Sequence, residues 1–259
     1  MNWKRFDVFA IIVLPLIAAA IVLKLNTDLL FISSLLFFGL PSLYIGLRNP
    51  GILRKSATFA FIFSIPMSII IDTLSALNGA YVIPKTIFPF KIFGISTVEL
   101  YLFSFLWVLM SVLFYEYFFD HGRKGDAISK RIRIFLYIVF AFSVVVLIML
   151  FANSRWLLIP YAYLVLGTLF TIIPLVAFLY FHPQFLPRFV VIAAYYFSFL
   201  MLYELVALAT HEWIFPGQFI GFVTVQGLSF PLEELLIWMI VCTPALLSYY
   251  EFVADDSKL

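Results

Sequence analysis

Two adjacent carboxylates, Glu233 and Glu234, open the last apolar stretch of the chain, directly after Pro231. Proline fits the first turn of a helix, because the N–H that it lacks would have no partner there. Carboxylates in a first turn also face the positive end of the helix dipole, so a plain helix start is one interpretation. The flanks are apolar, however, and a carboxyl group beside hydrocarbon is costly and is by default a functional hypothesis. We therefore favour a functional role.

Further carboxylates, Asp72, Glu99 and Glu204, fall within or at the edge of other apolar runs, and no Lys or Arg lies inside a predicted helix to neutralise them. A carboxyl group in a low dielectric keeps its proton at neutral pH, more so when a second carboxyl is close. Such a group is an acid that faces an apolar cavity, and its natural substrate is an alkene. For Asp72 and Glu204 an interhelical hydrogen bond is an alternative of equal weight. Glu116 and Glu251, near water at the inner helix ends, are expected to be interfacial charges.

Aromatic side chains lie close to these acids along the chain. Protonation of an alkene produces a carbocation, which each π face stabilises by about 0.5–2 kcal/mol. Trp238 lies one turn from Glu234 and should share its helix face. For any one membrane aromatic residue, packing or an interfacial belt is the commoner explanation. The candidates for substrate binding are Tyr81, Phe93, Tyr101, Trp107, Trp213, Phe230 and Trp238.

The composition places these residues in a membrane protein. Of 259 residues 64% are hydrophobic and 12% charged, whereas soluble domains carry about 25% charged residues. The chain has no basic stripe and no glycine-rich phosphate loop, so no nucleic-acid partner is expected. Cys242 stands alone, and the three histidines lack ligand spacing. We therefore expect no metal, no cofactor and no disulfide.

Eight apolar runs, each near the roughly 20 residues that span a bilayer, predict eight transmembrane helices. We expect the first run to be a retained helix and not a cleaved signal peptide. Turn-rich loops occupy residues 78–94 and 211–230, and a polar linker covers residues 120–133. The predicted helices cover residues 8–23, 29–47, 57–77, 97–119, 134–152, 157–181, 189–209 and 231–253.

The two halves of the chain align with each other at offsets of 132 to 135 residues. Such an internal repeat points to two related modules, and an even number of helices in each gives both the same orientation. The sequence thus predicts an all-α integral membrane protein, a tandem parallel repeat of two four-helix modules at residues 1–125 and 126–259. The matching pairs are Asp72 with Glu204, Tyr81 with Trp213, Pro84 with Pro216, Glu99 with Glu234, Tyr115 with Tyr250, and Glu116 with Glu251.

Basic residues divide unevenly between the two ends of the predicted helices. Twelve of the 16 lysines and arginines fall on the side that holds both termini, and four on the opposite side. The excess of positive charge indicates a cell-membrane protein with both termini in the cytoplasm. The turn-rich loops, Glu99 and Glu234 are then expected toward the outer face.

Both halves share an order of elements: an acidic residue near a helix end, a loop with Gly, Trp, Tyr or Pro, and an acidic motif. This order resembles the lycopene cyclase domain family, small membrane cyclases found as heterodimers or tandem fusions. The first half departs from the family's Pro-x-Glu-Glu, with Ser96-Thr97-Val98-Glu99 in its place. The second half carries Tyr203-Glu204, Trp213-Ile214-Phe215-Pro216, Gly227 and Pro231-Leu232-Glu233-Glu234-Leu235, and the first half Ile71-Asp72, Asn78-Gly79-Ala80-Tyr81, Gly94 and Val98-Glu99-Leu100.

The resemblance implies acid-initiated, non-redox cyclisation of the ends of a linear carotene such as lycopene, without a cofactor. It carries the acidic motif to Glu233 and Glu234, and to Glu99 in the first half. Adjacent helical residues point about 100° apart, so one of the pair faces the cavity. We predict that Glu234 donates the proton, because Leu235 and Trp238 flank its face, and that Glu233 supports it.

Other functions stay open at this point. A carotenoid hydratase would add water to the same cation, and an inactive relative would bind carotenoid or lipid without chemistry. A proton-coupled transporter is disfavoured, because the acids gather at one face and no polar string crosses the bilayer. The exact substrate, the ring type, the number of reacting ends, the activity of the first half and the oligomeric state, including a homo-oligomer, also stay open.

Overall fold

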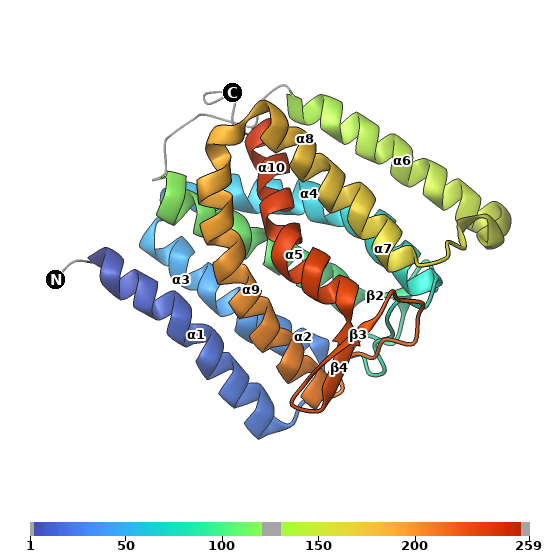
Figure 1. The fold of residues 1–259 in the computed structure, drawn as a ribbon, viewed down its shortest axis with the longest axis horizontal. Helices are drawn as coiled ribbons and strands as arrows, with labels where there is room; N and C mark the ends of the chain where they lie inside the picture. The colour runs from blue at the N-terminus through green and yellow to red at the C-terminus, as the bar shows by residue number, and fades with distance from the viewer. Residues whose placement is uncertain (1–2, 121–130, 255–259) are drawn as a thin grey trace.

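The computed structural model describes residues 3–120 and 131–254, which are almost entirely helical (Figure 1). Eight helical spans in this part of the chain are long and apolar enough to cross a membrane. This pattern is that of a multi-pass membrane protein, and the prediction of eight such helices is confirmed. The spans are Arg5–Leu25, Leu30–Arg48, Pro50–Leu77, Val98–Asp120, Arg133–Leu157, Ala162–Phe181, Pro183–Ala209 and Glu234–Val253.

Four spans precede residue 121, and short π-helical segments continue some of their α-helices. The predicted boundary between modules, at residue 125, lies outside the described residues. The elements are α1 (Trp3–Leu25), α2 (Leu30–Ser34), η1 (Leu35–Gly39), α3 (Leu40–Arg48), α4 (Pro50–Leu77), α5 (Val98–Tyr115) and η2 (Glu116–Asp120).

Four further spans follow residue 130, again with π-helical and 3-10 segments between α-helices. They are built from α6 (Arg131–Asn153), η3 (Ser154–Leu157), α7 (Ala162–Gly167), η4 (Thr168–Ile172), α8 (Ile173–Phe181), η5 (Pro183–Phe185), α9 (Leu186–Ala209), η6 (Glu234–Val241) and α10 (Cys242–Ala254).

Helix α4 begins seven residues before the predicted start at residue 57. Asn49 leaves the helical conformation with φ −143°, and Pro50 then occupies the first turn of the new helix. Proline breaks the preceding helix but suits a helix start, because its φ is already helical and its missing N–H is not needed there. The hydropathy pattern placed the start too late because Arg54 and Lys55 lie in this first part of the helix.

Each turn-rich loop contains a β-hairpin that the sequence patterns did not predict. In the first loop β1 (Lys91–Ile92) pairs with β2 (Ser96–Thr97), and in the second β3 (Phe222–Val225) pairs with β4 (Leu228–Pro231), both antiparallel. Gly94 and Gly227 adopt φ of +72° and +83° in the turns, a region that glycine enters without steric cost.

Pro231 lies in the second hairpin and not in the first turn of the last helix, where we predicted it. It pairs with Phe222 as the last residue of β4, and the helical residues begin at Leu232. A proline at the end of an edge strand removes no ladder hydrogen bond that the hairpin needs. The prediction was wrong by one position, because the conformations before and within a first turn both accept proline.

The two hairpin-containing loops contact each other and cover one end of the helix bundle. Val82 and Ile214 exchange backbone hydrogen bonds of 2.9 and 3.0 Å. Gly217 packs directly on the first loop, since a Cβ there would lie 2.9 Å from the backbone of Gly79 and Ala80. The loops therefore hold each other and form a roof over the helix ends.

The spans that contain α5 and α10 are the most buried, and those of α6 and α7–α8 are among the least buried. Figure 1 shows α1 and α6 along opposite edges of the bundle, while the start of α1 and the end of α10 lie away from the hairpins. Large apolar side chains on α1 and α6 stay exposed, as lipid-facing helices require. Which end of the bundle faces the cytoplasm stays a prediction.

Candidate functional site

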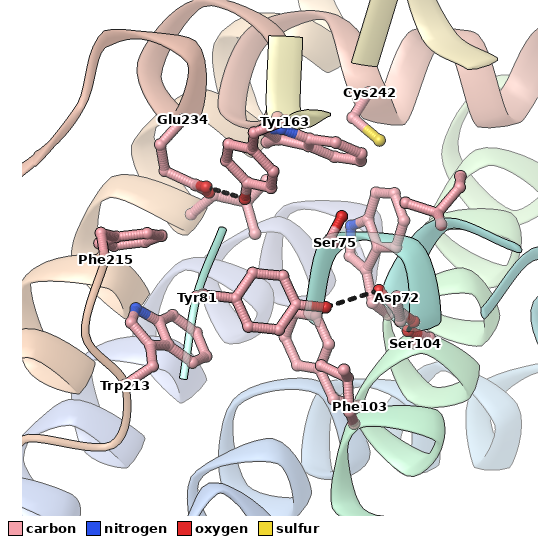
Figure 2. A pocket seen from close by; sticks show the side chains of 15 residues that line it. Asp72, Ser75, Tyr81, Phe103, Ser104, Tyr163, Trp213, Phe215, Glu234 and Cys242 are labelled. Carbon is pink, nitrogen blue, oxygen red and sulfur yellow. Dashed lines mark hydrogen bonds between the residues drawn. The ribbon is translucent and has the colours of Figure 1, made fainter. Parts of the chain in front are cut away.

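A cavity of about 120 Å³ lies beneath the roof formed by the two loops (Figure 2). Its 15 lining side chains are largely apolar and aromatic, and none of them is Lys or Arg. Two carboxyl groups, Asp72 from α4 and Glu234 from η6, reach this cavity. The cavity therefore combines acidic groups with an apolar, aromatic wall.

The roof positions aromatic rings over the cavity. Tyr81 and Trp213 directly precede the two residues of the Val82–Ile214 bridge, and both line the cavity. Phe215, on the other side of Ile214, also lines it. The Val82–Ile214 bridge thus fixes the position of these three rings relative to the helix ends.

Glu234 is the first residue of η6, and its Oε2 accepts a hydrogen bond from the hydroxyl of Tyr163 on α7 (Figure 2). The Tyr163 ring stacks on Trp238, with centroids 5.0 Å apart and planes at 26°. Close packing of α7 on η6 makes this contact, because a Cβ on Gly167 would lie 2.8 Å from Cγ2 of Ile237. π-Helical segments often occur at functional sites, and here one begins at the cavity carboxyl.

Asp72 receives a hydrogen bond on each of its oxygens. Tyr81 donates to Oδ1 at 3.2 Å, and Ser104 on α5 donates to Oδ2 at 3.0 Å (Figure 2). Tyr81 also contacts Tyr163 edge to face, with ring centroids 6.2 Å apart. Burial raises the pKa of the Tyr81 hydroxyl well above its ordinary value, and the neighbouring Asp72 carboxyl acts in the same direction. Tyr81 is therefore a stable hydrogen-bond donor to Asp72.

Glu204 on α9 is buried and lies behind the cavity wall instead of lining it. Its Oε1 accepts the indole N–H of Trp213 at 3.0 Å. This bond fixes the orientation of Trp213, whose ring faces the cavity. Glu204 acts on the cavity through that ring.

Glu99 and Glu233 also lie outside the cavity lining, and each is 1% exposed. Glu99 Oε1 accepts the backbone N–H groups of Ile87 and Phe88 at 2.6 and 3.0 Å. Glu233 Oε1 accepts the backbone N–H of Ile220 at 2.7 Å. Both carboxyls therefore fasten the hairpin-containing loops to the helix starts.

The predicted substrate-binding aromatics separate into two groups. Tyr81, Trp107, Trp213 and Trp238 line the cavity. Phe230 is completely buried in β4 and does not line it. The other two candidates are also elsewhere: Phe93 packs on Phe151 and Tyr101 bonds to Thr73.

A second cavity of about 70 Å³ continues the first toward the other end of the bundle. Asp72, Trp107 and Trp238 line both cavities, and the second one reaches Phe63 and Tyr249. Helical rise of 1.5 Å per residue places Tyr249 about 20 Å from Glu234 along the same span. The two cavities together therefore form an elongated apolar space.

Glu116 and Glu251, predicted as interfacial charges near water, are instead buried. Tyr250 donates to Glu116 and Tyr115 donates to Glu251, so the bonds cross between α10 and the α5–η2 span. Lys55 also contacts Glu116 Oε1 at 3.0 Å. Position at a helix end misled the prediction, because packing of the two spans covers both carboxyls.

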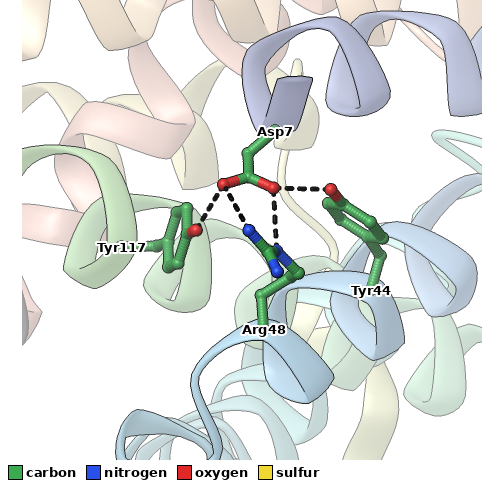
Figure 3. Close-up of polar contacts among 4 residues, drawn as sticks. All are labelled: Asp7, Tyr44, Arg48 and Tyr117. Carbon is green, nitrogen blue, oxygen red and sulfur yellow. Dashed lines mark hydrogen bonds and ion pairs between the residues drawn. The ribbon is translucent and has the colours of Figure 1, made fainter. Parts of the chain in front are cut away.

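A second buried polar cluster at this end of the bundle, which the sequence patterns did not reveal, centres on Asp7 (Figure 3). Arg48 contacts it at 2.9 Å, and Tyr44 and Tyr117 donate hydrogen bonds of 2.6 and 2.5 Å. The cluster ties α1, α3 and η2 together. Asp7 directly precedes the first predicted apolar run at residues 8–23, so the search for acids within apolar runs did not include it.

Glu212, in the second hairpin-containing loop, is likewise completely buried and was not predicted. Ser33 on α2 donates to Oε2 at 2.5 Å, and Thr210 donates to Oε1 at 3.2 Å. Burial raises the pKa of Glu212 from 4.5 to about 7, although the two hydroxyl donors lower it. Tyr163, the partner of Glu234, was also missed, because nothing in its local sequence separates it from a packing aromatic.

No family model, curated protein or solved structure matches the chain. Within residues 3–120 and 131–254, no group of three or more His, Cys, Asp and Glu side chains is arranged to hold a metal ion.

Proposed function

We propose that the chain is a membrane carotenoid cyclase that protonates the end of a linear carotene and closes a ring without redox change. The observation that carries this proposal is the cavity, in which the Asp72 and Glu234 carboxyls meet an aromatic wall without a lysine or arginine. The wall is largely apolar and aromatic, and an alkene needs only an acid and π faces. The resemblance of the acidic motif to lycopene cyclases agrees with this chemistry.

Glu234 donates the proton. Its transfer to the terminal carbon–carbon double bond forms one C–H bond and leaves a tertiary cation, which the neighbouring double bond attacks to close the ring. Loss of a proton from the ring then gives an isomer of the substrate. Trp107, Trp213 and Trp238 line the cavity and stabilise the cation by about 0.5–2 kcal/mol for each correctly placed ring.

The elongated, largely apolar space holds the reacting end of the polyene. It extends from Glu234 past Trp107 to Tyr249, along α4, α5 and α10. Most of its lining is apolar, and a polyene has no polar group that would need a partner there. The shape thus favours a linear hydrocarbon with its end at Glu234.

The proposal includes the tandem repeat of residues 1–125 and 126–259. Its support is that paired residues make paired contacts: Tyr81 with Asp72 matches Trp213 with Glu204. The crossed bonds of Tyr115 and Tyr250, and the Val82–Ile214 bridge, are the contacts expected between modules related by a twofold axis.

The contacts also refine the alignment of the acidic motifs. Glu99 and Glu233 both bind backbone N–H groups of their outer loops, so these two residues correspond. Leu100 is then the counterpart of Glu234, and both line the cavity. The first module therefore has no proton donor at the equivalent place and serves as one wall of a single active site.

The experiment is expression in a host that accumulates lycopene, with product analysis by chromatography and mass. Wild-type protein should convert lycopene to an isomer of equal mass, and Glu234→Gln should abolish conversion. Glu233→Gln is the matched control, because it makes the same change one residue away and outside the cavity. Membrane abundance of each variant shows whether it folds, and wild-type conversion by Glu234→Gln would refute the assignment.

A second candidate, hydration of the same cation, is favoured by polar atoms without partners. The buried Ser75 Oγ, Trp107 Nε1 and Trp238 Nε1 have no hydrogen-bond partner within the part of the chain that the structure describes, and all three residues line the cavity. Such groups commonly hold a water molecule. A product heavier than lycopene by one water for each reacting end would identify a hydratase.

A further inference from the structure

We propose that Asp72 is the proton acceptor of the reaction, the base that completes what Glu234 begins. This inference rests on the proposed function, in which a carbocation forms in the cavity and must lose a proton. Glu234 and Asp72, the two carboxyls that line the cavity, then have different roles, one as the acid and the other as the base.

The hydrogen bonds of the two carboxyls differ. Both oxygens of Asp72 accept hydroxyl groups, from Tyr81 at 3.2 Å and from Ser104 at 3.0 Å. A protonated carboxyl group must use one oxygen as a donor, whereas an ionised one accepts on both. Two hydroxyl donors therefore favour the carboxylate form of Asp72.

Glu234 has the pattern expected of the acid. Tyr163 donates to its Oε2, and no described side chain or backbone group donates to its Oε1. This leaves one oxygen free to carry the proton into the cavity that Glu234 lines. The two carboxyls thus begin a reaction cycle as acid and base.

Asp72 also has the right position. It lines both cavities, at the junction between the space beneath Glu234 and the space that continues along the bundle. Its helix, α4, is separate from η6, so the two carboxyls approach a bound chain end from different elements. Glu204, the residue that pairs with Asp72 in the proposed repeat, does not line the cavity and binds Trp213 instead.

The proton balance closes over one cycle. The Glu234 O–H bond breaks as a C–H bond forms, and a ring C–H bond later breaks as the Asp72 O–H bond forms. The hydrocarbon is neither oxidised nor reduced. Glu234 ends ionised and Asp72 ends protonated, and exchange with water after the product leaves restores both groups.

The test uses purified full-length protein with lycopene in D₂O and compares Asp72→Asn with Glu234→Gln. With Asp72→Asn the acid still protonates the alkene, but ring formation should fall by about 10²–10⁴-fold. The cation then keeps the added deuteron and returns one of its own protons to Glu234, so recovered lycopene should gain deuterium. With Glu234→Gln, neither ring nor deuterium should appear.

Asp72→Glu keeps an ionisable base and should recover part of the ring formation. Glu99→Gln is the control, because it neutralises a buried acid that binds backbone N–H groups outside the cavity lining, and it should keep the wild-type partition between ring formation and exchange. Ring formation by Asp72→Asn at the wild-type rate would overturn the inference. So would a folded Asp72→Asn protein that shows neither ring nor exchange, since Asp72 would then be needed before protonation. Wild-type protein that leaves lycopene unchanged would instead refute the proposed function.

Discussion

Replacing Glu212 by glutamine should change how the stability of this protein depends on pH. Glu212 is completely buried, and its pKa is raised from 4.5 to about 7 in the folded state. Below pH 4.5 the folded and unfolded states both hold the proton, and the full stability is present. As the pH rises toward 7 the unfolded state releases the proton while the folded state keeps it, so the free energy of unfolding falls.

The size of the effect follows from the pKa shift. One pKa unit corresponds to about 1.36 kcal/mol, so the shift of Glu212 amounts to about 3 kcal/mol between pH 4.5 and pH values above 7. A neutral glutamine side chain at this position would retain the hydroxyl partners Ser33 and Thr210 but has no proton to lose. The Glu212→Gln variant should therefore lack this part of the pH dependence.

The assay is denaturant unfolding in mild detergent at several pH values from 4.5 to 8.5, followed by tryptophan fluorescence. The difference in unfolding free energy between variant and wild type should move by about 3 kcal/mol in favour of the variant as the pH rises. Asp28→Asn is the control, because a hydrogen bond from Lys85 lowers the pKa of Asp28 from 3.8, so Asp28 stays ionised throughout this pH range and its own titration should not change the curve. Parallel pH curves for wild type and Glu212→Gln would refute the reasoning.

Three other predictions follow from the packing and the charges. Gly167→Ala places a Cβ 2.8 Å from Ile237, so the free energy of unfolding in detergent should fall by about 1–3 kcal/mol. An unchanged denaturant midpoint would contradict the close approach of α7 and η6. Arg48→Met leaves buried Asp7 without its cation, with an expected loss of about 3–5 kcal/mol, which Asp7→Asn in the same chain should partly restore. A reporter fused after Leu259 should read as cytoplasmic, and a periplasmic signal would reverse the proposed orientation.

The helices could be predicted from the sequence because apolar length is a local property. Runs of about 20 apolar residues have few other structures available in a membrane. The rule that a carboxyl beside hydrocarbon is conspicuous selected Asp72 and Glu234, which line the cavity, but equally Glu99, Glu204 and Glu233, which do not. Contacts between distant segments were not predictable in this way. The hairpin that holds Pro231, the burial of Glu212 by Ser33 and the bond from Tyr163 to Glu234 all depend on how the helices pack.

The crossed Tyr–Glu bonds between the α5–η2 span and α10 have an evolutionary consequence. Tyr115 binds Glu251 and Tyr250 binds Glu116, which are the two bonds that one shared Tyr-Glu pair would make across a symmetric dimer. Under the proposed repeat, the ancestor was a single short gene whose product paired with itself and offered two identical chambers. Duplication and fusion released the copies from that identity, so one could keep Leu100 while the other carried Glu234. Under the proposed function, fusion would thereby give the reaction a direction, because a symmetric polyene would meet an asymmetric cavity and react one end at a time.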